Sequence, residues 1–230
     1  MNKIAQNVYL EIGSGEAIES ENLVEFHLLY SGQLHSAGKP SEKHAIRKML
    51  HTQLRHLWSI HPNLSEMALG RGMILQPFTG TGPLKACPEH VEAGLKVMGG
   101  NFQRNGFNFL PLVTEDLCLR CSLEILFLRR EEKNYILQDG DIDGRIKTLF
   151  DALRITDKKD ELPPGAAPEG DEDPFFCLLE NDSLISEVHV KTGPLLMLPS
   201  AALIDKHDVY LQITVRLNTT RPVAHSWVFE

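Results

Sequence analysis

The chain has 230 residues, enough to bury a substantial core, and a formal net charge of −8. Its 42% hydrophobic and 23% charged residues are ordinary for a globular protein and exclude wholesale disorder. No apolar run approaches the roughly 18 residues that a membrane span needs, and residues 1–15 lack the apolar centre of a signal peptide. We therefore expect a cytoplasmic chain with no membrane partner and with reduced cysteines.

The first predicted elements are a strand and a helix. Leu23–Tyr30 is predominantly apolar and is followed by a Ser-Gly turn signal, which favours a strand. Ser41 can cap a helix that runs to about Trp58. The apolar side chains of this helix recur at helical spacing and predict its buried face: Ile46, Leu50, Leu54 and Leu57.

The same helix carries a second, basic stripe. From Lys39 to His56 the chain has five Lys or Arg residues against one Glu, a local charge of +4. This stripe is either a solvated helix face or a surface that contacts DNA phosphates. The residues assigned to the DNA-binding surface are Lys43, His44, Arg47, Lys48, His51 and Arg55.

The remaining pattern predicts an α+β fold, with a compact mixed β-sheet and two main helices, Ser41–Trp58 and Asp143–Arg154, packed against it. Gly70–Pro83 has the composition of a loop. Apolar and polar residues alternate between Leu117 and Phe127, which is typical of a strand. The other predicted elements are a short helix at Glu89–Val97 and strands at Leu184–Lys191 and Val209–Leu217.

An acidic, proline-rich segment follows the second main helix. Residues 157–174 hold seven acidic residues and two lysines, a net charge of −5, which leaves −3 for the rest of the chain. The global charge therefore says little about the field at a binding surface elsewhere. We interpret residues 157–175 as a loop inserted within a single domain that spans residues 1–230.

The strongest chemical signal is the run Asp139-Gly-Asp-Ile-Asp143, which leads into the second main helix. Asp143, Lys147 and Asp151 follow at four-residue steps and share one helix face. Asp141 directly precedes that helix, and Asp182 precedes a predicted strand. Carboxylates are the ligands that Mg²⁺ prefers, and a bound metal can position water and relieve charge on a phosphodiester.

These segments resemble the RusA family of Holliday junction resolvases. The resemblance rests on Asp141-Ile-Asp-Gly-Arg-Ile-Lys147, on Leu149-Phe-Asp-Ala-Leu153 and on Asn181-Asp-Ser-Leu-Ile185. The chain has Gly144 where the family usually has Asn, and Asn181 where it usually has the first Asp of a pair. The resemblance implies a homodimeric, Mg²⁺-dependent enzyme that cuts branched DNA in recombination and repair.

On that pattern Asp141, Asp143 and Asp182 would be metal ligands and catalytic residues, and Lys147 the essential catalytic lysine, with Mn²⁺ able to replace Mg²⁺. The expected activity is Holliday junction resolvase-like endonuclease action, the hydrolysis of phosphodiesters in branched DNA. The alternative is a non-catalytic interaction or DNA-binding protein of the same fold, within a phage-related or defence assembly.

Three other interpretations of the site remain open. The acidic run matches the first eight positions of an EF-hand calcium loop, but the twelfth position is Phe150 instead of Glu. Cys87, His90, Cys118 and Cys121 have zinc-like spacing, although two cysteines three apart in a strand face opposite ways. Finally, the acidic run could simply cap the helix, with Lys147 and Asp151 forming an exposed ion pair.

Overall fold

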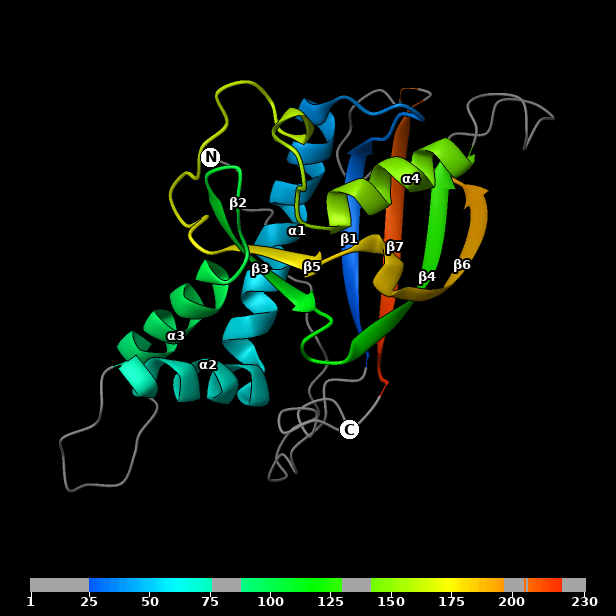
Figure 1. The fold of residues 1–230 in the computed structure, drawn as a ribbon. Coiled ribbons are helices and arrows are strands. Elements are labelled where there is room, and N and C mark those ends of the chain that lie inside the picture. Colours follow the sequence, from blue (N-terminus) through cyan, green and yellow to red (C-terminus); the bar gives the residue numbers. More distant parts are fainter. Residues whose placement is uncertain (1–24, 76–87, 130–141, 197–204, 206, 221–230) are drawn as a thin grey trace, which may run out of the picture.

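The computed structural model describes residues 25–75, 88–129, 142–196, 205 and 207–220. Their elements follow in this order (Figure 1): β1 (Glu25–Gln33), α1 (Pro40–Ile60), α2 (Pro62–Leu75), α3 (Pro88–Gly100), β2 (Gln103–Arg104), β3 (Phe107–Val113), β4 (Leu119–Arg129), α4 (Ile142–Leu153), β5 (Phe175–Leu179), β6 (Ile185–Pro194) and β7 (Asp208–Thr219). Short 3-10 turns lie at Lys159–Glu161 and Asp182–Leu184. The mixture of helices and mixed sheets confirms the predicted α+β class.

The larger sheet has the strand order β1-β7-β4-β6. β7 runs antiparallel to both β1 and β4, whereas β4 and β6 are parallel. Residues of β4 are alternately buried and exposed from Leu119 to Phe127, as its sequence pattern predicts. β6 lies at the edge of the sheet and is mostly exposed, because only one neighbour covers it.

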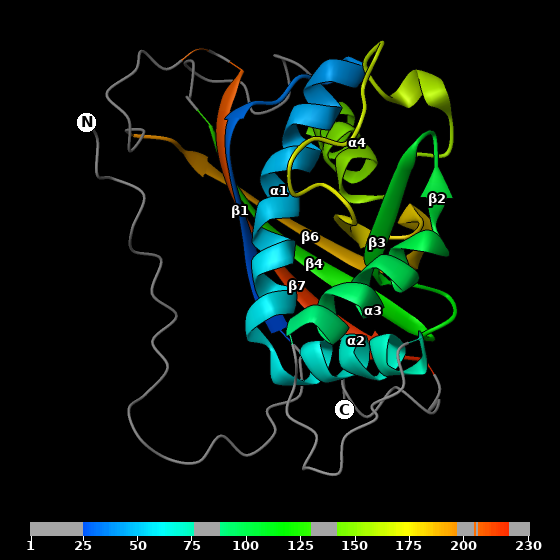
Figure 2. The ribbon, with the colours of Figure 1, turned by 90° about the vertical axis from the view of Figure 1, so that its left-hand side faces the viewer.

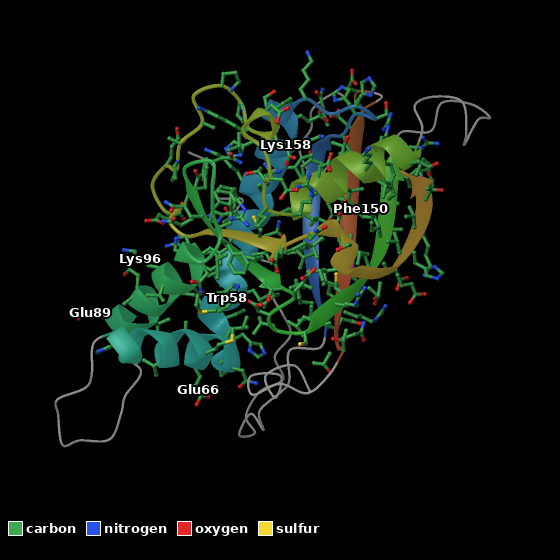
Figure 3. The ribbon with its side chains drawn as sticks, viewed as in Figure 1. Trp58, Glu66, Glu89, Lys96, Phe150 and Lys158 are labelled. Carbon is green, nitrogen blue, oxygen red and sulfur yellow. The ribbon has the colours of Figure 1, made fainter. Side chains whose placement is uncertain are left out.

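Helices α1 and α4 pack against each other and contribute to the main core (Figures 1 and 2). The predicted apolar stripe of α1 is buried except for Leu57, which is half-buried, and Trp58 completes it. Trp58 is labelled in Figure 3. Its ring lies 6.2 Å from that of Phe176 on β5. On α4, Ile146, Leu149 and Leu153 are buried and Phe150 is half-buried, which confirms the predicted stripe.

A second, smaller sheet, β2-β3-β5, is absent from the sequence prediction. β3 and β5 are parallel, and all five residues of β5 are buried. A fully buried strand shows a continuous apolar run without alternation, so periodicity does not reveal it. Phe107, Phe109 and Phe175 form an aromatic cluster on this sheet, with ring centroids 5.6–5.7 Å apart.

Several elements differ from the sequence prediction. Helix α2 is absent from that prediction; it extends to Leu75, so the predicted loop at Gly70–Pro83 is wrong for its first residues, and residues 76–83 lie outside the described part. Strand β1 continues through the expected Ser31-Gly32 turn to Gln33. Helix α1 begins at Pro40 after Lys39, without a side-chain cap, so Ser41 is not its N-cap. Proline suits the first helical position because its missing N–H would have no partner there. No helix among the described residues has the length and apolar character needed to cross a membrane.

The packing of α1 predicts a clear contrast between two adjacent residues. Leu50 is 2% exposed, and Met49 beside it is 43% exposed. We expect Leu50→Ala to lower the free energy of unfolding by about 2–5 kcal/mol, because it leaves a cavity in the main core. Met49→Ala should change it by less than about 0.5 kcal/mol. Urea unfolding monitored by circular dichroism measures both; equal losses would contradict the packing described above.

Candidate functional site

The predicted DNA-binding stripe of α1 is not an exposed surface. His44, Arg47 and His51 are 7%, 1% and 2% exposed, so their assignment to a phosphate-contacting face is wrong. These side chains point towards α4 and the second sheet. His44 and His51 both stack against Phe175, with ring centroids 5.9 and 4.6 Å away.

Arg47 has a structural role at the end of α4. Its Nη2 donates a hydrogen bond to the carbonyl oxygen of Asp151 at 2.7 Å, and its Nε donates to that of Arg154 at 3.4 Å. The last carbonyls of a helix lack partners within the helix. The guanidinium of Arg47 therefore caps α4 from a neighbouring helix, which explains why a cation is buried there.

The other three basic residues of the stripe form ion pairs. Lys43 Nζ lies 2.6 Å from a carboxylate oxygen of Asp151 on α4. Lys48 and Arg55 pair with the acidic segment 157–174, which folds back over α1. The pairs are Lys48 with Glu169 at 3.1 Å and Glu172 at 3.0 Å, and Arg55 with Asp171. The charge predicted for DNA is thus neutralised within the chain.

The predicted catalytic residues of α4 are open to solvent. Asp143 lies in the first turn of α4 and Lys147 one turn later, and both are exposed. Neither forms an ion pair within the described part of the chain. Asp151 pairs instead with Lys43 and, at 3.8 Å, with Arg154, so the alternative Lys147–Asp151 ion pair is wrong. Asp141 lies outside the described residues.

Asp182 and Asp143 lie towards opposite ends of the large sheet, although the turn that holds Asp182 also contacts α4. Ile185, three residues after Asp182, is paired with Cys121 near the beginning of β4. Gly144 contacts Ser36, just beyond the end of β1, and that end of the sheet also holds Arg129, the last residue of β4.

Cys121 and Arg129 are eight residues apart, about 26 Å along a strand, whereas carboxylates that share one Mg²⁺ lie within roughly 4–7 Å. Asp182 and Asp143 are therefore not brought together, and the expected set of three carboxylates does not fit one ion.

Glycine allows the close approach between α4 and the β1–α1 connection. A Cβ atom on Gly144 would lie 2.7 Å from the carbonyl oxygen of Ser36, and one on Gly38 would overlap Thr148. The backbone N–H of Gly38 donates to Thr148 Oγ1 at 3.1 Å. This contact forms the wall of a pocket of about 290 Å³, lined by Ser36, Ala37, Gly38, Lys43, Gly144, Lys147, Thr148 and Asp151.

A polar cluster that the sequence analysis missed lies beside this pocket. His35 Nδ1 and its backbone N–H are 2.9 and 2.8 Å from the same oxygen of Glu42. The His35 ring lies 4.1 Å from that of His207, whose Nδ1 is 3.5 Å from Nη2 of the buried Arg145. The sequence holds one local signal for this cluster, a histidine between the end of a strand and the start of a helix. That signal is weak unless the pairing of β1 with β7 is known.

The alternative metal sites gain no support. Among the described residues, no group of three or more His, Cys, Asp or Glu side chains could hold a metal ion. Cys118 and Cys121 are both buried, and burial raises the pKa of Cys121 to about 12. Cys87 of the predicted zinc set, and Asp139 and Asp141 of the calcium loop, lie outside the described residues.

Comparisons with protein-family models, with curated proteins and with solved structures give no match, so the resemblance to the RusA family stays an expectation from the sequence. The candidate site lies at the end of the large sheet where β1 ends, α4 begins and β7 begins.

The close contact at Gly144 predicts a specific loss of stability. Gly144→Ala should lower the free energy of unfolding by about 1–3 kcal/mol, because the Ser36 backbone must move. Gly70→Ala is the matched control: it lies in α2 with open space around its Cβ position, and we expect a gain of about 0.5–1 kcal/mol. Chemical unfolding of both variants tests this, and a stabilised Gly144→Ala would contradict the contact.

The buried histidines predict a pH dependence of stability. Burial and the neighbouring Arg47 lower the pKa of His44 to about 4, and burial also lowers that of His51. Between pH 6.5 and 4 the unfolded chain binds more protons than the folded one, so the stability due to these residues is lost as the pH falls. The loss from His44 should be on the order of 2–3 kcal/mol at pH 4.

His44→Phe should make the decrease shallower, because the replacement cannot be protonated and can stack on Phe175. The exposed His56 provides the control variant, His56→Phe, which should keep the wild-type slope. Urea unfolding at several pH values between 7 and 4 measures the slope. An unchanged slope in His44→Phe would show that His44 titrates normally in the folded protein.

Proposed function

We propose that this chain is a Mg²⁺-dependent endodeoxyribonuclease whose site lies at the start of α4. The proposal rests on the exposure and the ion pairing of Asp143 and Lys147. They are one turn apart, exposed, and outside the ion-pair network of the described residues, whereas Lys43, Lys48, Arg55 and Arg154 all have carboxylate partners. A carboxylate and a cation left unpaired on one helix face are available for a ligand.

The donor chemistry at this place suits Mg²⁺. This ion keeps several of its water molecules and is commonly bound by only one or two carboxylates together with substrate phosphate oxygens. Asp143 and Asp141, two residues earlier in the sequence, would supply such a pair, and Asp182 would take no part. When bound, the ion would activate water and offset charge on the phosphate.

Lys147 and Lys43 would contact the phosphate. Both line the pocket between α4 and the β1–α1 connection. Lys43 is held by Asp151, so its charge is partly compensated, while Lys147 is not. We therefore assign to Lys147 the stabilisation of negative charge that develops on the phosphate in the transition state. The backbone contact at Gly144 keeps this lysine close to the connection.

Branched DNA and homodimer formation are proposed from the family resemblance. The DNA would not lie along α1, because Lys48 and Arg55 are occupied by the acidic segment. A path over the first turn of α4 keeps the phosphates away from residues 157–174 and their net charge of −5. A smaller number of phosphate contacts would give a shallow dependence of affinity on salt.

A second candidate is a non-catalytic interaction protein with this fold. It is favoured by the separation of Asp182 from Asp143 and by the neutralised stripe of α1. Such a protein would bind its partner without cleaving DNA, whatever ion is present.

The nuclease proposal predicts a pattern across three variants. Asp143→Asn and Lys147→Met should each reduce DNA cleavage by about 10²-fold or more, because the first removes a charged metal ligand and the second removes the cation that stabilises the phosphate. Asp182→Asn should retain activity within a few-fold, since Asp182 lies at the other end of β4. A gel assay on four-way junctions, flaps and linear duplexes with Mg²⁺ or Mn²⁺ measures all three.

Two outcomes would contradict the proposal. If Asp182→Asn is as inactive as Asp143→Asn, the two carboxylates act together and the arrangement described above is not the active one. If wild-type protein with either ion cuts none of these DNAs, the interaction-protein alternative replaces the nuclease.

A further inference from the structure

The two edges of the large sheet differ in how their backbone groups are covered. β1 forms one edge and β6 the other. At the β1 edge, the side-chain amide of Gln53 on α1 accepts a hydrogen bond from the backbone N–H of Leu29 at 2.9 Å. The same amide donates a hydrogen bond to the carbonyl oxygen of Leu29 at 2.7 Å. Helix α1 therefore occupies positions that another strand would need in order to pair with β1.

The β6 edge has no such cover within the described part of the chain. β6 spans Ile185–Pro194, and β4 is the one described strand that pairs with it (Figure 1). Among the residues that the structure describes, no side chain bonds to the backbone of β6 as Gln53 bonds to that of β1. An open strand edge of this length presents a row of N–H and C=O groups that can pair with another strand.

Exposed apolar side chains gather at this edge. Five large hydrophobic side chains of the described residues are exposed, and three of them lie on or beside β6. They are Val188 on β6 at 39%, Leu126 on the neighbouring β4 at 36%, and Leu196 just after β6 at 89%. A strand paired with β6 would remove part of this apolar surface from water, which is favourable.

The side chains of β6 alternate between the two faces of the sheet. Glu187, His189 and Lys191 lie on the face opposite the main core, and their side chains are 65%, 70% and 67% exposed. Val188 and Val190 lie on the core face, because they pair with buried residues of β4. β6 thus carries a row of ionisable side chains on one face and two β-branched apolar residues on the other.

Two antiparallel copies of β6 complement each other in one register. With His189 opposite its own copy, Glu187 of each copy lies opposite Lys191 of the other, and Val188 lies opposite Val190. Opposite charges and β-branched residues that lie directly across two strands stabilise a sheet. A shift by two residues in either direction would lose both charge pairs, and a shift by one would place valines against charged residues.

We propose that the β6 edge binds the β6 edge of a second copy of this chain in that antiparallel register. The two four-stranded sheets then form one continuous sheet, and both copies present α1 and α4 on the same face. Pro194, which has no N–H to donate, lies just outside the paired segment 185–193. Lys191 lies between Glu124 of its own chain, 2.5 Å away, and the second copy's carboxylate at position 187. The inference rests on the homodimer in the proposed function and deepens it by naming the surface.

The first experiment measures the mass of the full chain by sedimentation equilibrium. The wild type should reach the mass of a dimer between about 1 and 200 μM, because an interface of one strand per copy is small. Glu187→Lys and Lys191→Glu each place like charges opposite each other at two positions, so each should weaken association by about ten-fold or more. An equimolar mixture of the two variants restores opposite charges at both positions and should associate within about three-fold of the wild type.

The matched control is Glu66→Lys, the same change of charge at an exposed residue of α2 (Figure 3). This variant should associate like the wild type, because it leaves β6 unchanged. Circular dichroism of each variant checks that the chain remains folded.

A second experiment tests the register by cross-linking. His189→Cys places two thiols opposite each other, at the Cα separation of about 4.5–5.5 Å that suits a disulfide. Copper-catalysed oxidation should therefore give a covalent dimer on a non-reducing gel. In the control Thr192→Cys, the two thiols are about 20 Å apart along the strands, so this variant should give no more cross-linking than the wild-type chain with its own cysteines.

The outcomes separate this inference from the proposed nuclease. A wild type that stays monomeric over the whole concentration range overturns the β6 interface, and so do charge variants that associate like the wild type. Equal cross-linking of His189→Cys and Thr192→Cys overturns the register. A dimer that cuts no DNA supports the interface and overturns the nuclease. A monomer that cuts DNA overturns the interface and leaves the nuclease standing.

Discussion

The packing of α1 against α4 is the constraint on which the rest of the molecule depends. Helix α1 and the connection before it are joined to α4 at three places: the close contact of Gly38 with Thr148, the ion pair of Lys43 with Asp151, and the capping of the last α4 carbonyls by Arg47. The first contact needs a residue without a side chain, and the last needs a long buried cation. Together they set where the first turn of α4 lies, and therefore where Asp143 and Lys147 are presented.

The acidic segment 157–174 follows from the same arrangement. With Arg47 and the two histidines turned inward, Lys48 and Arg55 remain on the outer side of α1, and Arg154 lies at the end of α4. Five of the seven acidic residues pair with these three cations: Asp157 and Glu161 with Arg154, Glu169 and Glu172 with Lys48, and Asp171 with Arg55. Each exposed pair contributes little by itself. Together they neutralise the basic stripe of α1, which the sequence alone suggests as a DNA-binding surface.

The sequence predicts the periodic elements well and the contacts between them poorly. The apolar stripes Ile46–Leu54 and Ile146–Leu153 and the alternation in β4 are local patterns. The sequence therefore predicts them without knowledge of the elements that pack against them. The burial of His44 and His51 depends on Phe175, more than a hundred residues away, and no local pattern encodes it. The same holds for the site. Helical spacing in the sequence is enough to find Asp143 and Lys147. The separation of Asp182 from Asp143, however, follows from the parallel pairing of β6 with β4. The His35–Glu42 pair likewise depends on the turn between β1 and α1.

Gly144 sets how closely the β1–α1 connection approaches the start of α4. Any Cβ atom on this residue would meet the Ser36 backbone at 2.7 Å. An asparagine would force the β1–α1 connection away from α4, and with it His35, which precedes Ser36. The glycine therefore permits the connection to approach the first turn of α4, where Asp143 and Lys147 are exposed.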